Sequence, residues 1–428
     1  MVLCGGGPVS DVVVVGLGYV GLPLVVEMAA AGHRVVGLDR DEAVVAGLVA
    51  GRSHVDDVAD ASVAAMLDRF TPTVDPGCIR DAEVVVVCVP TPLSGDGAPD
   101  LGAVAAVGRL LGEHLRPGTL VVLESTTYPG TTEDLFQPLI EGGGLRVGRE
   151  LNLAFSPERV DPGNTRFGIK NTPKVVGGVT AACTQRAAEF YGGFVDTVVP
   201  AKGTREAEMA KLLENTYRHI NIALVNEMAR FSHELGIDLW NVIECARTKP
   251  FGFQAFYPGP GVGGHCIPID PNYLSHTVQA RLRYPFRFVE LAQEINASMP
   301  GYVARRIQDR LNDEGKAVRG STVLLLGVTY KADIADERES PAVPVAEKLI
   351  AMGADVRFHD PYVTDWNAAS RGEPLRIIKA EPDLVAAAGK ADAVVLLQAH
   401  EEYLGGLLDG IPILDTRGVL RGDAVERL

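Results

Sequence analysis

A glycine motif near the N-terminus constrains the fold of this chain more than any other feature. The segment DVVVVGLGYVG joins an all-valine run to a G-x-G-x-x-G motif made by Gly16, Gly18 and Gly21. A buried strand, a tight turn and a helix start must therefore follow one another. The first glycine permits the turn, the second lets the backbone approach a pyrophosphate, and the third lets the helix pack on the strand. The motif predicts a doubly wound α/β domain that binds a dinucleotide.

The following run, HRVVGLD, predicts a second strand that ends at Asp39. A carboxylate at this place accepts hydrogen bonds from the ribose hydroxyls of adenosine and repels a 2′-phosphate. NAD is therefore favoured over NADP, although Arg40 beside the carboxylate weakens the preference slightly. A purely structural glycine-rich turn is the alternative, and the complete strand, turn and helix context makes it the weaker one.

The rest of the chain alternates valine- and leucine-rich runs with amphipathic segments, which is typical of parallel sheets covered by helices. A second half of this kind comes late in the sequence, where ADVRFHD and KADAVVLLQAHEE repeat the pattern of HRVVGLD and DAEVVVVCVPTP. Between the halves, about Lys202 to Leu235 reads as one helix with no glycine or proline in its interior. We predict an α/β fold of two Rossmann-like doubly wound domains, joined by a long central helix and a helical middle domain. The expected boundaries are 1–200, 201–314 and 315–428.

Composition excludes several classes of partner. The formal net charge of −15 over 428 residues argues against nucleic acid and anionic membranes. The most apolar stretch, Val12 to Gly32, is broken by glycines and contains Glu27, so it reads as strand and helix, not as a membrane span. Six cysteines without a C-x-x-C pair or zinc spacing indicate reduced thiols, no metal site and a cytoplasmic location.

A few polar residues stand where chemistry is expected. Cys266 lies in the loop GGHCIPIDP, where backbone amides can converge on a thiolate, although most cysteines are small buried hydrophobes. Lys211 and Asn215 share one face of the central helix, with a solvated polar stripe as the alternative. Thr126 and Glu158 follow predicted strands, and ligands bind at the carboxyl ends of strands in such sheets. Asp270 after the cysteine loop has helix capping as its alternative role.

Four segments together carry a resemblance to a known family. They are PGPGVGGHCIPIDP, EMAKLLENTYR, SPERVDPGN and LLGVTYKADIADERESP. With them the chain resembles the UDP-sugar 6-dehydrogenases over nearly its whole length. The resemblance implies an NAD-dependent enzyme that oxidises a primary alcohol of a UDP-sugar to a carboxylate. It also implies a homodimer formed through the central helix and a place in polysaccharide biosynthesis.

The resemblance assigns roles to the residues above. Cys266 would attack the aldehyde formed by the first hydride transfer and, after the second, would hold a thioester that water hydrolyses. Lys211 and Asn215 would stabilise the oxyanions that develop. Acid–base chemistry and the placement of water would fall to Thr126, Glu158 and Asp270.

The resemblance also implies two sets of binding residues. Those expected to hold NAD are Gly16, Gly18, Tyr19, Val20, Gly21, Asp39, Arg40, Pro90, Thr91, Thr126 and Arg338. Those expected to hold the UDP-sugar are Glu158, Arg159, Lys211, Asn215, Phe256, Tyr257, Gly263, Lys331 and Arg417. Lys331 and Arg338 would tie the second α/β half, the substrate and NAD together.

The sugar follows less directly from the sequence. The cysteine loop and the SPER segment resemble the N-acetylhexosamine branch, and Pro268-Ile269 favours UDP-N-acetylglucosamine over UDP-N-acetylmannosamine. Phe256 and Tyr257, with neighbouring aromatics, would form an apolar pocket for an acetyl methyl or simply pack a dimer core. The alternatives are UDP-glucose or UDP-N-acetylgalactosamine as substrate, a two-electron dehydrogenase with no covalent step, and a non-catalytic NAD or UDP sensor. An epimerase is disfavoured because no Tyr-x-x-x-Lys spacing lies near the site segments.

Overall fold

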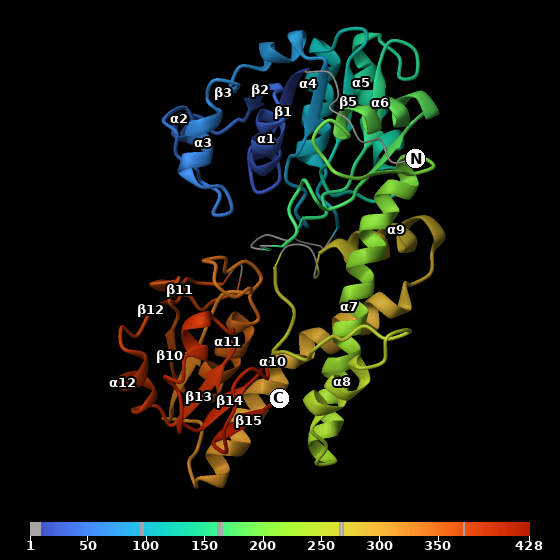
Figure 1. The fold of residues 1–428 in the computed structure, drawn as a ribbon. Coiled ribbons are helices and arrows are strands. Elements are labelled where there is room, and N and C mark those ends of the chain that lie inside the picture. The colour runs from blue at the N-terminus through green and yellow to red at the C-terminus, as the bar shows by residue number, and fades with distance from the viewer. Residues whose placement is uncertain are drawn as a thin grey trace. The chain divides into compact units, whose positions relative to one another are not determined.

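The computed structural model describes residues 10–94, 98–160, 164, 166–264, 267, 269–370 and 373–428. The chain forms two compact units (Figure 1). The first comprises the residues up to Glu214 together with Asn272–Leu282, and the second comprises Asn215–Pro271 and Arg283–Leu428. Both contain a mostly parallel sheet flanked by helices, so the predicted α/β class is confirmed.

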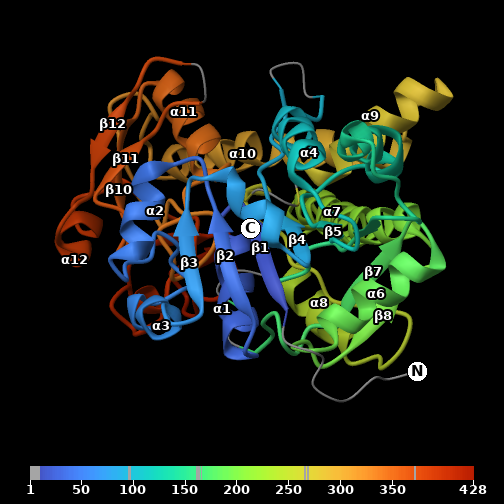
Figure 2. The ribbon, with the colours of Figure 1, turned by 90° about the horizontal axis from the view of Figure 1, so that it is seen from above.

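An eight-stranded sheet in the order β3-β2-β1-β4-β5-β6-β7-β8 organises the first unit (Figure 2). Neighbouring strands are parallel except for the antiparallel pair β6 and β7. The strands are β1 (Asp11–Val15), β2 (Arg34–Leu38), β3 (Phe70–Thr73), β4 (Val84–Val87), β5 (Leu120–Leu123), β6 (Asn152–Phe155), β7 (Lys174–Gly178) and β8 (Val198–Pro200). The helices beside them are α1 (Gly21–Ala30), α2 (Glu42–Val49), α3 (Asp60–Met66), α4 (Gly102–His114), α5 (Gln137–Ile140) and α6 (Ala181–Tyr191).

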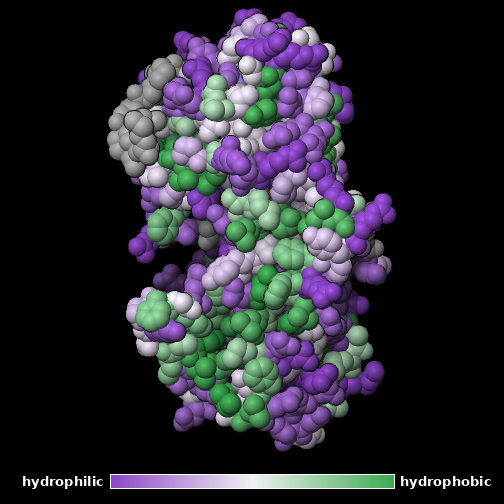
Figure 3. Space-filling view, turned by 90° about the vertical axis from the view of Figure 1, so that its right-hand side faces the viewer, coloured by the Kyte–Doolittle hydropathy of each residue, from purple (hydrophilic) through white to green (hydrophobic). Residues whose placement is uncertain are grey.

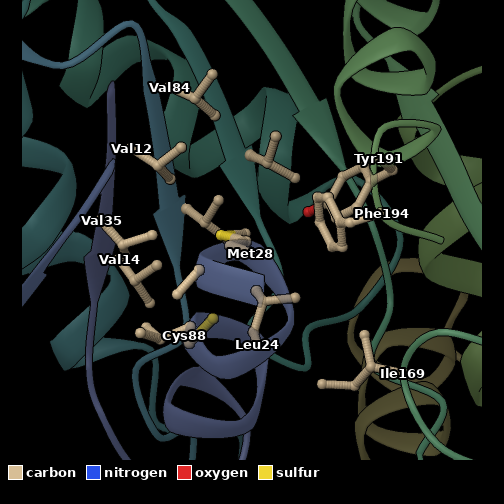
Figure 4. Packing of buried hydrophobic residues seen from close by; sticks show 14 of the residues in the cluster. Val12, Val14, Leu24, Met28, Val35, Val84, Cys88, Ile169, Tyr191 and Phe194 are labelled. Carbon is tan, nitrogen blue, oxygen red and sulfur yellow. The ribbon is translucent and has the colours of Figure 1, made fainter. Parts of the chain in front are cut away.

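Valine-rich strands form this sheet because both of its faces are covered. All four valines of β4 are buried. Successive side chains of a strand point to opposite faces, so Val12 and Val14 of β1 join the core that contains Leu24 and Met28 of α1 (Figure 4). The intervening valines join a second core with residues of α4 and α5. Strands buried on both faces read as continuous apolar runs, and β-branched valine suits the pleated surface.

Helices dominate the middle of the chain. The predicted long helix is confirmed as α7 (Thr204–Glu234), and a second long helix, α10 (Arg287–Asp313), follows it. Between them lie α8 (Leu239–Arg247) and α9 (Asp270–Leu282). Among the described residues, no helix combines the length and the apolar character that crossing a bilayer requires.

The second unit contains a five-stranded parallel sheet in the order β10-β9-β13-β14-β15 and a small antiparallel pair, β11 and β12. The strands are β9 (Thr322–Leu326), β10 (Asp355–His359), β11 (Asp365–Asn367), β12 (Ile377–Lys379), β13 (Ala393–Leu396), β14 (Ile413–Asp415) and β15 (Val425–Arg427). The helices α11 (Ala342–Met352) and α12 (Leu384–Ala388) complete it. One face of the five-stranded sheet packs with α10 and α11, and the other packs with α12.

The internal repeat is visible in individual hydrogen bonds. In the first half the amide of Leu17 donates to Asp39 Oδ2 at 2.8 Å, and in the second the amide of Val328 donates to Asp360 Oδ2 at 2.7 Å. The halves differ around this carboxylate, because buried His400 places its Nε2 3.1 Å from Asp360 Oδ2. The second half therefore keeps the strand-end aspartate, but buries it against an imidazole.

Candidate active site

The loop between β1 and α1 has the geometry that a pyrophosphate requires. Gly16 has a φ of 92°, and a Cβ there would lie 2.7 Å from the carbonyl oxygen of Cys88. A Cβ on Gly21 would meet the Gly16 oxygen at 1.9 Å, so only glycine lets α1 begin this close to β1. A Cβ on Gly18 would meet nothing within 4 Å. Open space therefore adjoins Gly18 near the N-terminus of α1, where backbone amides favour an anion.

Asp39 lies beside this loop at the end of β2. Its Oδ2 is held by the Leu17 amide, and its Oδ1 accepts from the amide of Asp41 at 3.0 Å. The side chain remains partly exposed, and Arg40 next to it is exposed. A fixed, accessible carboxylate beside a glycine loop suits the hydroxyls of a ribose, so the residues present fit NAD.

The other predicted cofactor residues of the first unit differ in exposure. Tyr19 is 41% exposed and Val20 is half-buried at the start of α1. After β4, Pro90 is exposed, whereas Thr91 is buried and its carbonyl accepts a hydrogen bond from the hydroxyl of Tyr273 on α9. All of these residues follow β1 or β4, which are neighbours in the sheet, and ligands of doubly wound sheets bind at the carboxyl ends of the strands.

Two buried polar pairs anchor one face of α7. Lys211 is 7% exposed, and its Nζ donates to Thr126 Oγ1 at 2.7 Å. One turn later, Asn215 is 8% exposed, and its Nδ2 donates to Asp270 Oδ2 at 2.6 Å. A solvated polar stripe is therefore excluded at these positions. Cys266 lies outside the described residues, four positions before Asp270 in the sequence.

Glu158 follows β6 and is strongly held. Its Oε1 accepts from the amides of Arg159 at 2.8 Å and Val160 at 2.6 Å, and its Oε2 lies 3.5 Å from Lys174 Nζ. Burial raises the pKa of Glu158, but the charge of Lys174, the Val160 amide and Lys211 outweigh it and hold the pKa below its usual value. Glu158 is therefore ionised at neutral pH, which suits a proton acceptor.

The guanidinium of Arg159, expected to bind substrate, has protein partners. Its Nη2 donates to Glu214 Oε1 at 2.7 Å, and its Nη1 donates to the carbonyl of Pro173 at 2.6 Å. Arg159 thus links the segment after β6 to α7. Any contact with substrate would share the guanidinium with Glu214.

Glu208 of α7 is buried, and the sequence analysis did not single it out as a candidate. Its carboxylate accepts from the amide of Gly130 at 2.6 Å, and from the amide and hydroxyl of Thr132 at 2.9 and 2.7 Å. Burial raises its pKa to about 7, although these donors oppose the shift. Glu208 ties the loop that follows Thr126 to the helix that carries Lys211. Its spacing of three from Lys211 on one helical face was the available signal.

In the second unit, the loop before Cys266 packs closely on the segment that follows β9. A Cβ on Gly263 would lie 2.8 Å from both the Glu339 carbonyl oxygen and the Tyr330 Cβ, so only glycine fits. The amide of Gly264 donates to the carbonyl of Arg338 at 3.1 Å. Lys331 is half-buried beside Tyr330.

The Arg338 side chain is directed by a neighbouring acid. Its Nε donates to Asp336 Oδ1 at 2.8 Å, and its Nη2 also pairs with the same carboxylate. The Arg338 side chain is 47% exposed. It can therefore still reach a ligand while Asp336 restricts its rotation.

Tyr257 and Arg417 line the same pocket of about 500 Å³. The Tyr257 ring stacks on Trp240 with a centroid distance of 5.7 Å, and its hydroxyl donates to Glu244 at 2.6 Å. Arg417 donates through Nε to the carbonyl of Leu397 at 2.7 Å. Burial lowers its pKa to about 10, with Asp415 opposing the shift. Both residues were expected to bind substrate. The pocket lining also contains Asp238 and Glu244, so it combines acidic, basic and aromatic side chains.

Phe256 has a different environment from Tyr257. It is half-buried and packs on a small core that includes Val225, Leu239 and Ile243. Its ring meets Tyr217 edge to face at 5.7 Å. Packing within the chain therefore accounts for this aromatic side chain without a ligand.

The described residues hold no cluster of His, Cys, Asp and Glu suited to a metal ion. The described cysteines, at positions 78, 88, 183 and 245, carry free thiols. Burial raises the pKa of Cys78 to about 11 and that of Cys88 well above its usual value. Neither thiol is poised as a nucleophile at neutral pH.

A doubly wound sheet, an open glycine loop and a strand-end aspartate define the class: a dinucleotide-binding protein of the α/β dehydrogenase type. Three family models match the chain in order. They describe the NAD binding domain (residues 10–195), the central domain (205–298) and the UDP binding domain (324–422) of the UDP-glucose/GDP-mannose dehydrogenase family. The chain belongs to this family, and it is an NAD-dependent UDP-sugar dehydrogenase.

Relatives named after different sugars resemble the chain about equally. A UDP-N-acetyl-D-mannosamine dehydrogenase of Methanococcus aeolicus is 32% identical over 92% of this chain and 86% of its own. The structure of UDP-D-ManNAc dehydrogenase from Pyrococcus horikoshii is 31% identical, with a TM-score of 0.87 over 97% of this chain and 98% of its own. The structure of a UDP-glucose dehydrogenase from Pyrobaculum islandicum is 28% identical, with the same TM-score over 100% and 98%. The fold therefore does not discriminate between sugars.

Proposed function

We propose that this enzyme oxidises the 6-hydroxymethyl group of a UDP-N-acetylhexosamine to a carboxylate through a thioester on Cys266. The overall change consumes one water and two NAD, and releases two NADH and three protons. Bound NAD supplies the hydride acceptor for both oxidations. The chain itself supplies the nucleophile, the groups that stabilise oxyanions and the groups that move protons.

The main observation behind this proposal is the buried polar face of α7. Lys211 and Asn215 are buried there and hydrogen-bonded to Thr126 and Asp270. Burying an ammonium or an amide costs desolvation free energy. Such groups are therefore buried where they bind polar partners. Preorganised donors of this kind stabilise an alkoxide or a tetrahedral oxyanion as charge develops on it.

The proton transfers fall to acidic and hydroxyl groups at known places. In the proposal, Glu158 accepts a proton directly or from water, because it is ionised at neutral pH. Asp270, fixed by Asn215, directs the water that cleaves the thioester. Cys266 bonds to the aldehyde carbon as a thiolate, the second hydride leaves that carbon, and water displaces the thiolate.

Within the N-acetylhexosamines we infer UDP-N-acetylglucosamine as the substrate, from the Pro268-Ile269 pair after the cysteine. The Methanococcus and Pyrococcus relatives are named for N-acetylmannosamine, which makes the mannosamine epimer the second candidate. A pocket that differs by one small group discriminates by only about 1–3 kcal/mol. Oxidation of a second sugar at a lower rate is therefore expected.

The experiment is NADH production from NAD with limiting UDP-N-acetylglucosamine, UDP-N-acetylmannosamine, UDP-N-acetylgalactosamine or UDP-glucose. We expect two NADH per sugar, with UDP-N-acetylglucosamine giving the highest kcat/KM. A preference for another sugar would replace the substrate and keep the mechanism. One NADH per sugar would contradict the thioester, and no NADH with any sugar would favour a sensor.

We also propose that the enzyme is a homodimer in which α7 lies in the interface. Apolar side chains repeat along one face of this helix and are 39–61% exposed: Met209, Leu213, Tyr217, Leu224 and Phe231. Hydrophobic residues gather on the surface over α7 and α8 (Figure 3). Contiguous exposed apolar surface of this kind marks an interaction site.

Sedimentation velocity tests the dimer. We expect the mass of two chains for the wild type and of one chain for Leu224→Glu, because an unpaired carboxylate in an apolar interface is costly. Glu113→Lys, at an exposed carboxylate on α4, serves as the charge-changing control and should remain dimeric. A monomeric wild type would contradict the proposal.

A further inference from the structure

A buried cluster of charged side chains contacts Glu158 in the first unit. Lys174, the first residue of β7, is 5% exposed, and its Nζ lies 2.7 Å from Glu124 Oε2 and 3.5 Å from Glu158 Oε2. Glu124 follows β5 and is 1% exposed. One ammonium is thus shared by two carboxylates, and the shorter contact belongs to Glu124.

Glu124 is itself fixed on its far side. The hydroxyl of Tyr191, the last residue of α6, donates to Glu124 Oε1, and the Lys174 ammonium lies 5.4 Å from the Tyr191 ring centroid. Burial lowers the pKa of Lys174, but the two carboxylates outweigh it and raise the pKa above its usual value. Lys174 is therefore charged at any pH at which the enzyme works.

Stability alone is a poor reason for such a cluster. Removing two charges from water costs several kcal/mol per ion, and well-packed apolar residues of similar volume often stabilise a protein as much or more. The strands β4 and β5 of the same sheet consist of buried valines and leucines, so apolar residues are readily accommodated in this sheet. The cluster is better explained by what it does to Glu158.

The other groups that face Glu158 are few. The charge of Lys211 on α7 also lowers the pKa of Glu158, but its ammonium is hydrogen-bonded to Thr126. The Arg159 guanidinium is bound to Glu214 and the Pro173 carbonyl. Cys88, after β4, adds to the field at Lys174 only if its buried thiol ionises. Among the described residues, Lys174 makes the only ion-pair contact with Glu158.

We propose that Lys174 and Glu124 are positioning residues that set the charge and the orientation of Glu158, Lys174 by attracting it and Glu124 by competing for the same ammonium. The inference rests on the proposed function, in which Glu158 accepts protons. It predicts opposite effects for two substitutions. Removing the ammonium leaves Glu158 buried without its ion-pair partner, whereas removing the Glu124 charge gives Lys174 to Glu158 alone.

The experiment is the pH dependence of kcat with saturating UDP-sugar and NAD. Since Glu158 must be ionised, kcat falls as pH falls through its pKa. For Lys174→Met we expect this acid limb to move to higher pH by about one unit or more, which is a tenfold loss of rate below the limb. For Glu124→Gln we expect a smaller move to lower pH, because burial raises the pKa of Glu124 and Glu124 competes for the ammonium only while it is ionised. Lys174→Arg should keep the limb close to that of the wild type.

Controls separate this inference from structural damage. Lys170→Met, at an exposed lysine in the same unit, removes an equal charge and should leave the limb in place. The inference would be overturned if the variants lowered the maximal kcat without moving the acid limb. It would also be overturned if the acid limb moved in the same direction in both variants. Where Lys174→Met does not fold, as judged by circular dichroism and NAD binding, the shift of Glu124→Gln decides alone.

A readout without turnover separates failure of the inference from failure of the proposed function. Carbon-13 NMR of protein labelled at the glutamate carboxyl carbons follows the titration of Glu158 directly, with Glu158→Gln assigning its resonance. Opposite shifts of this titration in Lys174→Met and Glu124→Gln would support the inference even if the wild type oxidised no sugar. If the enzyme oxidises a UDP-sugar but Glu158 titrates at the same pH in both variants as in the wild type, the inference is overturned and the proposed function stands.

Discussion

Replacing Cys266 by alanine should lower the rate of carboxylate formation by on the order of 10³-fold or more, because removing a covalent nucleophile removes the entire acyl route. The aldehyde would then have no thiol to add to, and the second hydride transfer would have no thiohemiacetal to act on. The measurement is NADH production with limiting UDP-sugar, together with mass spectrometry of wild-type enzyme quenched during turnover. The wild-type peptide that contains Cys266 should carry the mass of the sugar acyl adduct.

Cys245→Ala is the matched control, since Cys245 is exposed on α8 and has no part in the proposed chemistry. It should retain the wild-type rate. Full turnover of Cys266→Ala with one NADH per sugar would instead establish a two-electron dehydrogenase without a covalent step. Cys266→Ser offers a further check, because an ester that forms slowly would accumulate and be visible by mass.

Replacing Lys211 by methionine should lower kcat about 10²–10³-fold, the usual cost of removing one donor that stabilises a developing oxyanion. The side chain is 7% exposed and its Nζ donates to Thr126 Oγ1 at 2.7 Å, so the ammonium is already in place before charge develops. Methionine keeps the length of the side chain and loses the charge. Steady-state kinetics should show a fall in kcat with a much smaller change in KM.

Lys202→Met is the control for Lys211, because Lys202 is an exposed lysine just before α7. It should keep both kinetic constants. Lys211→Arg should not restore the rate, since a planar guanidinium does not reproduce a point charge at a buried hydroxyl. An increase in KM alone for Lys211→Met would contradict the proposed role and indicate that Lys211 binds substrate and transition state equally.

Features encoded in short segments of sequence were predictable. Gly16 and Gly21 have the steric constraints expected of them, and space is open beside Gly18, since a turn and the start of a helix depend on neighbouring residues. The extent of α7 followed from an uninterrupted helical run. The internal repeat was also readable, because strand, turn and aspartate recur at the same spacing around Asp39 and Asp360.

The candidate site was predictable only where a single segment carries the signal. Lys211 and Asn215 were chosen from one helix face, and the structure adds their partners Thr126 and Asp270, which are 85 and 55 residues away. Glu208 was not singled out as a candidate, although it is buried. Nothing in the helix sequence distinguishes a polar residue facing water from one facing a loop that comes 76 positions earlier.

The sequence by itself determined the α/β class, the dinucleotide loop and the family, because these depend on local spacing and on motifs read in order. The tertiary structure decided which polar groups are buried and which partners they contact. It placed Lys174 between Glu124 and Glu158, 50 and 16 residues away, and it covered Asp360 with His400, 40 residues further on. The reason is electrostatic: the charge and reactivity of a side chain depend on burial and on partners across the sheet, and only folding brings those partners together.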